Sequence, residues 1–407
     1  MENKNNKKNK PACRRGRKVF VGMSGGVDSS VTSALLKEQG YDVTGVFIKV
    51  WQPDFIECQW KQDRLDAMRV CAFLDIPFLD LDLEKEYKEG VFDYMIDEYK
   101  KGRTPNPDVM CNKKIKFGAF LDFALKKGSD YIATGHYVRL NFTALRALYH
   151  SNSARSAVKE LLAGVDGNKD QSYFLWTLTQ KQLKHCLFPV GEFEKSEVRK
   201  MAKKFGLINA QKKDSQGLCF VGKVDMKEFL ERFIPNKKGD ILNMEGKKIG
   251  EHDGVHYYTL GQRHGFKILE KGIDDNAYYV VAKDLEKNTL IVSQDSLKLT
   301  TWKPGFQVEK KIIEIEYINW VLGEEPEFFV SSLRGGHDEA VQKKYLARIR
   351  YRQPLQNCVL TKKDSPNLSD GQGKIFVNFE KEQKTASAGQ SIVIYDGDIC
   401  LGGGVIK

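Results

Sequence analysis

The chain has 407 residues, with 65 Lys and Arg against 54 Asp and Glu, which gives a formal net charge of +11 at pH 7. This length predicts two or three domains rather than one core. No stretch of about 20 apolar residues occurs, and the N-terminus lacks the apolar core of a secretory signal. We therefore expect a soluble, cytoplasmic protein that has no membrane association and binds a polyanionic partner.

Residues 1–17 are rich in Lys, Arg and Asn, so we expect a disordered basic tail. The eight cysteines contain no C-x-x-C pair and no set with zinc-ligand spacing, so the sequence predicts no metal site. Most of these cysteines should be reduced and buried.

The first predicted element is a short strand, Val19–Val21, followed by the loop S-G-G-V-D-S-S and a helix from Val31. Bare backbone at Gly25 and Gly26 can approach a phosphate, and the helix N-terminus adds partial positive charge. We expect a Cβ at Gly26 to fill this cradle or to clash at positive φ. The loop matches neither the Walker pattern nor G-x-G-x-x-G. It resembles the PP-loop of ATP pyrophosphatases; a Gly-rich turn that only connects strand and helix is the alternative.

Strands and helices then alternate up to residue 221, which predicts a doubly wound, mostly parallel sheet. The predicted elements are strand Val43–Val50, helix Arg64–Leu74, strand Ile76–Leu81, helices Lys85–Lys101 and Phe117–Lys127, and strand Tyr131–Thr134. Ligands bind at the carboxyl ends of such strands, so Gly22–Ser30, Phe47–Trp51 and Thr134–His136 should line one crevice.

Two cysteines have basic neighbours. Pro105 and Pro107 disfavour a helix, so we expect Cys111 on or just after a rigid loop. Lys113, Lys114 and Lys116 should lower its thiol pKa, and Asp108 is close enough to act as a general acid or base. The alternative is that Cys111 is a small core residue.

Cys219 follows a basic pair and a predicted turn, Asp214–Gly217. An exposed cysteine on such a loop has the mobility that a sulfur carrier needs. Its distance from Cys111 in the fold does not follow from the sequence.

The pattern of predicted secondary structure changes after residue 221, where short β segments dominate. We expect a central β-rich domain over 222–298 and a C-terminal β-barrel over 299–407. The predicted strands are Lys247–Gly250, Val255–Thr259, Tyr278–Ala282, Ile312–Ile318, Tyr345–Arg350, Gln356–Thr361 and Ser391–Tyr395. Asn141–Gly164 and Val330–Lys344 are expected to be loops, the first with a short helix.

The motifs together resemble those of the bacterial-type tRNA-specific 2-thiouridylases, from residue 18 to residue 406. In order they are G-M-S-G-G-V-D-S-S, G-R-T-P-N-P-D-V-M-C-N-K-K-I-K-F, A-T-G-H-Y, N-K-D-Q-S-Y-F-L, K-K-D-S-Q-G-L-C-F, Y-T-L-G-Q-R-H-G, R-Y-R-Q and G-Q-S with L-G-G-G-V-I.

This resemblance implies three sets of site residues. ATP would be held by Gly22, Met23, Ser24, Gly25, Gly26, Val27, Asp28 and Ser29, with the backbone of Ile48 and Gly135 near the adenosine. Cys111 would be the nucleophile, Cys219 the persulfide carrier and Asp108 the acid or base. tRNA contacts would come from Asn106, Pro107, Asp108, His136, Lys169, Asp170, Gln171, Arg350, Tyr351 and Gln390. The family usually has Met at the position of Ile48, so packing on the base differs here.

The implied reaction is ATP-dependent 2-thiolation of the wobble uridine of tRNAs for Lys, Glu and Gln. Mg²⁺ would accompany ATP, with Asp28 as an indirect partner, and a cysteine desulfurase or sulfur-relay protein would donate the persulfide. Without the resemblance, Lys169 and Arg350 would be read as solvated charges. The alternatives are a PP-loop ligase or amidotransferase acting on a small metabolite, and a non-catalytic RNA-binding protein.

Overall fold

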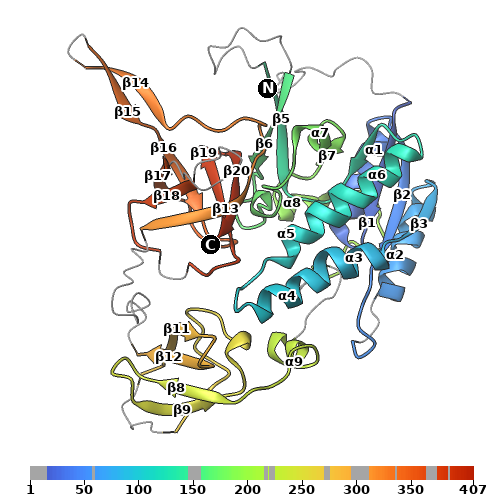
Figure 1. The fold of residues 1–407 in the computed structure, drawn as a ribbon. Coiled ribbons are helices and arrows are strands. Elements are labelled where there is room, and N and C mark those ends of the chain that lie inside the picture. The colour runs from blue at the N-terminus through green and yellow to red at the C-terminus, as the bar shows by residue number, and fades with distance from the viewer. Residues whose placement is uncertain are drawn as a thin grey trace.

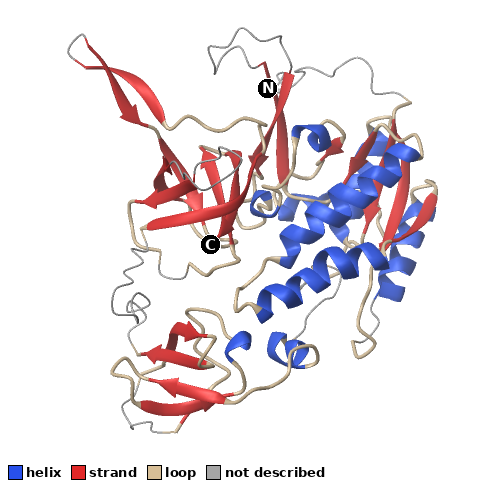
Figure 2. Ribbon diagram, viewed as in Figure 1, coloured by secondary structure: helices blue, strands red, loops and turns tan. Residues whose placement is uncertain are grey.

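A computed structural model shows the chain in three parts (Figure 1). The structure describes residues 16–56, 60–144, 157–214, 219, 225–269, 276–294, 311–334, 337–363, 374–383 and 386–407. Helices gather around the N-terminal sheet, while the other two parts are mainly strands (Figure 2). Residues 1–15 of the expected basic tail lie outside the described residues.

The N-terminal sheet has five parallel strands in the order β3-β2-β1-β4-β7. These are β1 (Lys18–Met23), β2 (Asp42–Lys49), β3 (Phe78–Asp82), β4 (Tyr131–Ala133) and β7 (Cys186–Leu187). The chain moves outward from β1 through β2 to β3 and then returns to pair β4 on the other side of β1. The carboxyl ends of β1 and β4 therefore flank the switch point at which such sheets bind ligands. The predicted Rossmann-like fold is confirmed.

Helices cover this sheet. They are α1 (Val27–Glu38), α2 (Trp60–Phe73), α3 (Glu84–Tyr87), α4 (Tyr94–Lys100), α5 (Pro107–Cys111), α6 (Phe120–Lys126), α7 (Gln180–Leu183) and α8 (Lys195–Lys204). Single π-helical stretches join α3 to α4 (Lys88–Asp93) and α5 to α6 (Asn112–Ala119). Such stretches are frequent at functional sites.

The prediction that two prolines keep Cys111 out of a helix is wrong. Pro107 occupies the first helical position of α5, where its missing N–H costs nothing, and Asn106 caps the helix by accepting from the Val109 N–H. Cys111 is the last residue of α5 and is fully buried. The helix continues through the π-helical stretch into α6, so the thiol is on a rigid element.

The central part begins with α9 (Met226–Glu231) and contains a sheet in the order β10-β9-β8-β12-β11. Its strands are β8 (Gly239–Leu242), β9 (Lys248–His252), β10 (Lys267–Ile268), β11 (Tyr279–Asp284) and β12 (Thr289–Ser293). The predicted strand at Val255–Thr259 is wrong, because Val255–Tyr257 form a 3₁₀ turn. Tyr257 and Tyr258 are both buried, which a strand with one buried face does not allow for consecutive residues.

Six C-terminal strands form a closed barrel in the order β13-β18-β17-β16-β19-β20, with β20 pairing back to β13. They are β13 (Ile312–Trp320), β16 (Lys344–Arg348), β17 (Gln356–Lys363), β18 (Lys374–Phe379), β19 (Ser391–Asp396) and β20 (Ile399–Ile406). Closure removes the open edges of the sheet. The predicted C-terminal barrel is confirmed.

Two segments predicted as loops are β-hairpins. β5 (Val138–Ala144) and β6 (Ala157–Ala163) pair with each other, and β6 joins the barrel sheet through Leu162 opposite Ile399. β14 (Phe329–Arg334) pairs with β15 (His337–Gln342). The first hairpin depends on a long-range strand pairing that local sequence patterns do not report. Residues 145–156 and 335–336 lie outside the described residues.

A buried ion pair joins the N-terminal part to the barrel. Arg348 on β16 pairs with Asp170, and the two side chains are only 7% and 5% exposed. Arg348 also donates to the hydroxyls of Ser172 and Tyr395, at 3.1 and 2.8 Å. Loss of one partner from such a pair leaves an uncompensated buried charge. This cluster therefore fixes the segment around Asp170 against the barrel.

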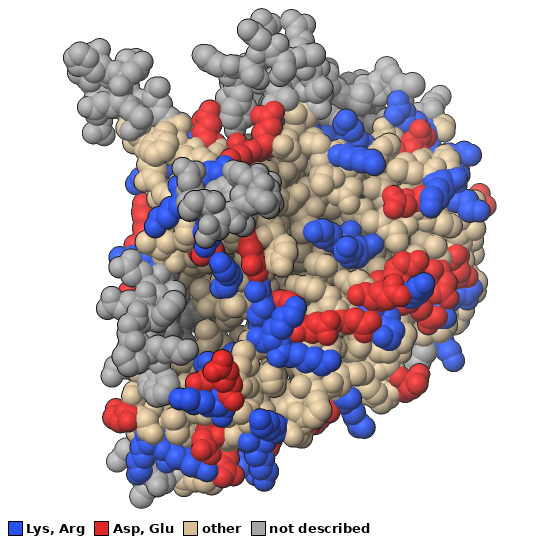
Figure 3. Space-filling view, viewed as in Figure 1, with Lys and Arg blue, Asp and Glu red and all other residues tan. Residues whose placement is uncertain are grey.

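In the part of the chain that the structure describes, no helix is long and apolar enough to cross a membrane. On the face shown in Figure 3, Lys and Arg side chains are interspersed with Asp and Glu, and a dense acidic band lies at the right. Attraction of a polyanion on this face therefore depends on particular cations rather than on a uniform basic surface.

Candidate active site

The PP-loop connects β1 to α1, and Gly26 is the N-cap residue of α1. No side chain caps this helix. The Ser29 and Ser30 hydroxyls instead donate to the Gly26 carbonyl, at 3.2 and 2.9 Å. The N–H groups of the first turn are thus available for an anion, which the helix dipole favours. This fits the predicted phosphate site.

Gly25, rather than Gly26, is the glycine that this backbone requires. Gly25 has φ +69°, and an added Cβ would lie 2.3 Å from the Asp63 carbonyl oxygen. Gly26 has φ −86°, and an added Cβ would meet only the Ser24 hydroxyl, at 3.2 Å. The expectation of a positive φ at Gly26 is therefore wrong.

The end of β4 packs against the start of α1. A Cβ on Gly135 would lie 2.9 Å from the backbone of Asp28, so only glycine allows this approach. Next along the chain, the Tyr137 hydroxyl donates to the Asp28 carboxylate at 2.8 Å. Lys195 Nζ, on α8, donates to both oxygens of the same carboxylate, at 2.7 and 2.8 Å. Asp28 is thereby fixed beside the phosphate cradle.

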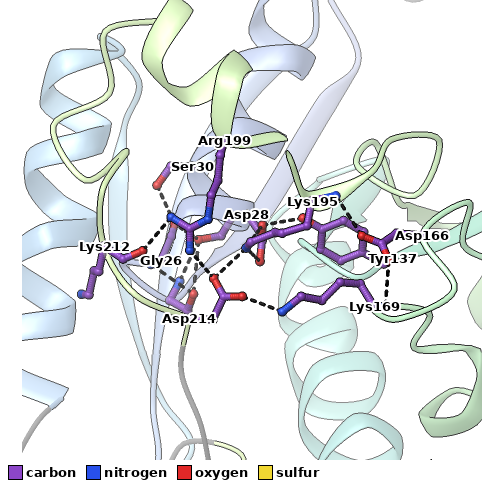
Figure 4. Close-up of polar contacts among 12 residues, drawn as sticks. Gly26, Asp28, Ser30, Tyr137, Asp166, Lys169, Lys195, Arg199, Lys212 and Asp214 are labelled. Carbon is purple, nitrogen blue, oxygen red and sulfur yellow. Dashed lines mark hydrogen bonds and ion pairs between the residues drawn. The ribbon is translucent and has the colours of Figure 1, made fainter. Parts of the chain in front are cut away.

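Asp214 is the centre of a second cluster, which Figure 4 shows beside Asp28. It pairs with Lys195 at 2.9 Å, Arg199 at 2.7 Å and Lys169 at 2.5 Å. Burial would raise the pKa of Asp214, but hydrogen bonds from Lys169 and Lys195 outweigh it and lower the pKa to about 2. Lys195 therefore links the PP-loop helix to the segment that leads to Cys219.

The two cysteines that the sequence singled out meet. Cys111 Sγ donates to Cys219 Sγ at 3.3 Å, and both thiols are free. The Cys219 N–H donates to the Asp108 carboxylate at 3.0 Å. A sulfur atom held on Cys219 would therefore lie beside a second thiol, as sulfur transfer between them requires.

The lowered thiol pKa that was predicted for Cys111 is found at Cys219 instead, although the charge of Lys116 acts on both thiols. Burial, followed by the hydrogen bond to Cys219, raises the pKa of the Cys111 thiol well above its usual value. The hydrogen bond from Cys111 lowers the pKa of Cys219, and the charge of Lys116 lowers it further. Burial raises the pKa of Asp108. Cys219 is consequently the thiol with the greater thiolate character.

Residues 135–137 contact the PP-loop helix and the π-helical stretch that follows Cys111. Gly135 and Tyr137 contact Asp28, whereas His136 between them packs against Phe117. Its ring centroid is 5.7 Å from that of Phe117, and burial, followed by the charge of Lys116, lowers the pKa of His136 well below its usual value. His136 thus lies near Lys116, the lysine whose charge also acts on Cys219.

Three other residues that were predicted to bind ATP have their side chains in the core. Met23, Val27 and Ile48 have buried side chains, so only their backbone can face a ligand. Asp28 remains the predicted indirect Mg²⁺ partner, although Lys195 occupies both of its oxygens. Among the described residues, no group of three His, Cys, Asp or Glu could hold a metal ion.

The predicted tRNA-binding residues fall in three places. Asn106 and Pro107 form the start of α5, and the Gln390 amide donates to the Thr104 carbonyl oxygen at 3.0 Å. The barrel therefore touches the loop that leads to Cys111. The RNA contacts of these residues stay predictions.

The second group lies around Tyr137 and Asp214. Gln171 accepts from the Tyr137 N–H at 3.0 Å, and Lys169 is held by Asp214. Asp170 is buried in its pair with Arg348, so its role here is to anchor the segment.

The third group is on the barrel. Tyr351 lies 4.6 Å from Phe174 between ring centroids, which extends an aromatic surface toward the N-terminal part. Arg350 is half-buried, and burial lowers its pKa.

Sequence reasoning missed four residues of this site: Tyr87, Lys195, Arg348 and Asp214. The sequence places Asp214 in a predicted turn and in the motif K-K-D-S-Q-G-L-C-F, but it predicts no role for its side chain. The other three carried no motif that separates them from solvated or core residues. Their roles follow from contacts between segments far apart in the chain.

Three family models match the chain in succession. They are described as a tRNA methyl transferase HUP domain (residues 17–223), a tRNA methyl transferase PRC-barrel domain (227–294) and an aminomethyltransferase beta-barrel domain (310–406). The tRNA-specific 2-thiouridylase MnmA of Hydrogenovibrio crunogenus is 43% identical over 393 residues, 96% of this chain and 93% of that protein. The chain belongs to the tRNA-specific 2-thiouridylase family.

A second relative of the same name, from Francisella tularensis subsp. novicida, is 43% identical over 395 residues, 96% of this chain and 99% of that protein. The family resemblance inferred from the motifs is confirmed. Among solved structures, the U34-tRNA thiolase NcsA of Methanococcus maripaludis is 19% identical and covers 55% of this chain and 68% of its own, with a TM-score of 0.32.

We predict that Gly25→Ala destabilises the protein by about 1–3 kcal/mol, because alanine is strained at positive φ and its Cβ would collide with the Asp63 carbonyl. Gly26→Ala is the control, since its φ is negative, and should cost less. Thermal and denaturant unfolding measure both changes. Because the control keeps its fold, a loss of ATP affinity in Gly26→Ala would report a phosphate contact. Equal stabilities of the two variants would contradict the assignment of Gly25.

We predict that Lys116→Met raises the pKa of Cys219, because it removes a positive charge that stabilises the thiolate. Alkylation of Cys219 by iodoacetamide should shift to higher pH and be about three- to tenfold slower near neutral pH, one pKa unit being about tenfold. Peptide mass spectrometry measures the reaction across a pH series. Lys114→Met, two residues away, is the control. An equal shift in both variants, or none in Lys116→Met, would contradict the prediction.

Proposed function

We propose that this protein catalyses ATP-dependent 2-thiolation of uridine at position 34 of tRNA, giving 2-thiouridine, AMP and pyrophosphate. The observation that carries the proposal is the contact of two free thiols, Cys111 and Cys219, at 3.3 Å. Residues 135–137 contact the PP-loop helix at Asp28 and, through His136, pack against Phe117 in the helical stretch that follows Cys111. The names of the full-length relatives support the same reaction.

ATP fits the part of the site that the PP-loop and the N-terminus of α1 form. The uncapped N-terminus of α1 and the backbone of Ser24 to Gly26 would hold phosphates, with Lys195 nearby. ATP supplies the AMP group that turns the C2 oxygen of uridine into a leaving group. Mg²⁺ would accompany the triphosphate, since hard oxygen ligands suit it.

Sulfur transfer uses the other part of the site, the pair Cys111 and Cys219. The terminal sulfur of a Cys219 persulfide attacks C2, and AMP leaves with the C2 oxygen. Cys111 then loses its thiol proton to a base, and its sulfur attacks Cys219 Sγ, which forms a Cys111–Cys219 disulfide and leaves the transferred sulfur on C2. In the other order, Cys111 attacks first and the released hydrosulfide attacks C2. Either route ends in the disulfide, which a thiol reductant must reopen.

Asp108 is proposed as the acid or base for these proton transfers. Burial raises its pKa, which brings the carboxyl group closer to holding a proton in the working pH range. It also fixes Cys219 by accepting from its N–H.

RNA recognition is assigned to the barrel and the loop before Cys111. The wobble base must leave its stack to reach the thiols. Arg350 supplies a phosphate contact, and Tyr351 stacks on a base or ribose. The substrates proposed are tRNAs for Lys, Glu and Gln, with a cysteine desulfurase or sulfur-relay protein as the sulfur donor.

A PP-loop ligase or amidotransferase acting on a small metabolite is the alternative, and it leaves the paired thiols without a role. ATP–pyrophosphate exchange separates the two: stimulation by tRNA supports thiolation, and stimulation by a metabolite alone contradicts it. Loss of 2-thiouridine at position 34 in tRNA from cells that lack the gene is the direct test.

We predict that Cys111→Ser and Cys219→Ser each abolish thiolation and leave tRNA binding nearly unchanged, because serine has a similar size but cannot carry persulfide sulfur. Cys186→Ser is a control at another buried cysteine, on β7. A purified sulfur-transfer assay and a tRNA-binding assay measure the two properties. Activity like that of the wild type in either variant would remove that cysteine from the mechanism.

We predict that Arg350→Ala weakens tRNA binding and reduces its salt dependence by about one phosphate contact. Lys344→Ala, at an exposed residue of β16, is the control. Affinity at several salt concentrations and the melting temperature are measured together. An unchanged salt slope in a normally stable variant would exclude the contact, and a lower melting temperature alone would show that Arg350 only braces the barrel.

A further inference from the structure

The peptide groups that flank Cys219 are held on both sides by side chains from other helices. Its N–H donates to the Asp108 carboxylate at 3.0 Å, and its carbonyl oxygen accepts from the Tyr87 hydroxyl at 2.9 Å. Asp108 lies on α5, and Tyr87 is the last residue of α3. Two separate helices thus determine where the backbone of Cys219 lies.

Tyr87 is suited to a fixed position. Its side chain is 4% exposed and packs in the same apolar cluster as Cys111 and Val109. Burial, followed by the nearby thiols and Asp108, raises the pKa of Tyr87 well above its usual value. The hydroxyl therefore stays protonated, and it is a donor to the Cys219 carbonyl at every working pH.

The two hydrogen bonds to the Cys219 backbone also determine where its sulfur atom lies. Rotation of the Cys219 backbone would break the bond to Asp108, the bond to Tyr87, or both. With both bonds formed, Cys219 Sγ lies 3.3 Å from Cys111 Sγ. The hydroxyl of Tyr87 itself contacts the backbone and not the reacting sulfur, so it acts through Cys219.

We propose that Tyr87 is a positioning residue that holds the carrier cysteine against Cys111, an inference that rests on the function proposed above. Removal of its hydroxyl releases one side of the Cys219 backbone and lowers the fraction of molecules in which the two thiols meet. Of the two bonds that the structure describes at the Cys219 backbone, the one to Asp108 then remains.

The test is the thiol–disulfide equilibrium of Tyr87→Phe, measured on the full chain in glutathione buffers without tRNA or ATP. Cys111 and Cys219 lose two electrons and two protons as they form a disulfide, and oxidised glutathione takes them up to give two molecules of glutathione. The equilibrium constant should fall about three- to tenfold, the range for one lost hydrogen bond. Tyr99→Phe is the control, at another buried tyrosine of the same helical region.

A second readout separates positioning from stability. The hydrogen bond from Cys111 lowers the pKa of Cys219, so a looser backbone should move the alkylation profile of Cys219 to higher pH. Both effects in Tyr87→Phe, with neither in Tyr99→Phe, support the inference. An unchanged disulfide equilibrium in Tyr87→Phe, or an equal loss in Tyr99→Phe, overturns it. Because no tRNA is present, a failure of wild-type thiolation would contradict the proposed function without altering this result.

Discussion

The close packing of Gly135 against the first turn of α1 is the constraint on which the site depends. An added Cβ there would lie 2.9 Å from the backbone of Asp28. The same short segment then places Tyr137 against Asp28 and His136 against Phe117. Because β4 and β1 are neighbours in a parallel sheet, their carboxyl ends bring residues 135–137 beside the helix terminus that is proposed to bind phosphate.

Burial and charge give the two cysteines different chemistry. Cys111 is at the end of a rigid helix in an apolar cluster, and burial raises its pKa. Cys219 accepts the hydrogen bond of Cys111 and lies near Lys116, so its pKa is lowered. A pair with one protonated donor and one thiolate is suited to hold sulfur on the second cysteine and resolve it with the first.

Both β-rich parts contact the loop that precedes Cys111. The Thr104 N–H donates to the Ala388 carbonyl oxygen at 2.8 Å, and the Thr104 hydroxyl lies 3.2 Å from that of Thr259. Lys283 Nζ donates to the carbonyl oxygens of Gly102 and Tyr258, at 2.6 and 2.8 Å. The position of the loop is therefore set jointly by the central and C-terminal parts. These contacts make both parts determinants of the site's geometry, in addition to the RNA contacts proposed for the barrel.

The sequence by itself determined the parallel α/β fold and the position of the PP-loop, and it singled out Cys111 and Cys219, because each of these depends on local patterns of glycine, charge and apolar residues. Local patterns predicted a loop where the hairpin β5–β6 forms, because long-range strand pairing decides that segment. They also predicted no helix at Pro107, where the capping residue Asn106 starts α5. Only the tertiary structure decided that the two thiols meet, that Lys116 acts on Cys219, and that Tyr87 holds its carbonyl. Contacts between segments far apart in the chain decide these features, and they leave no local signature in the sequence.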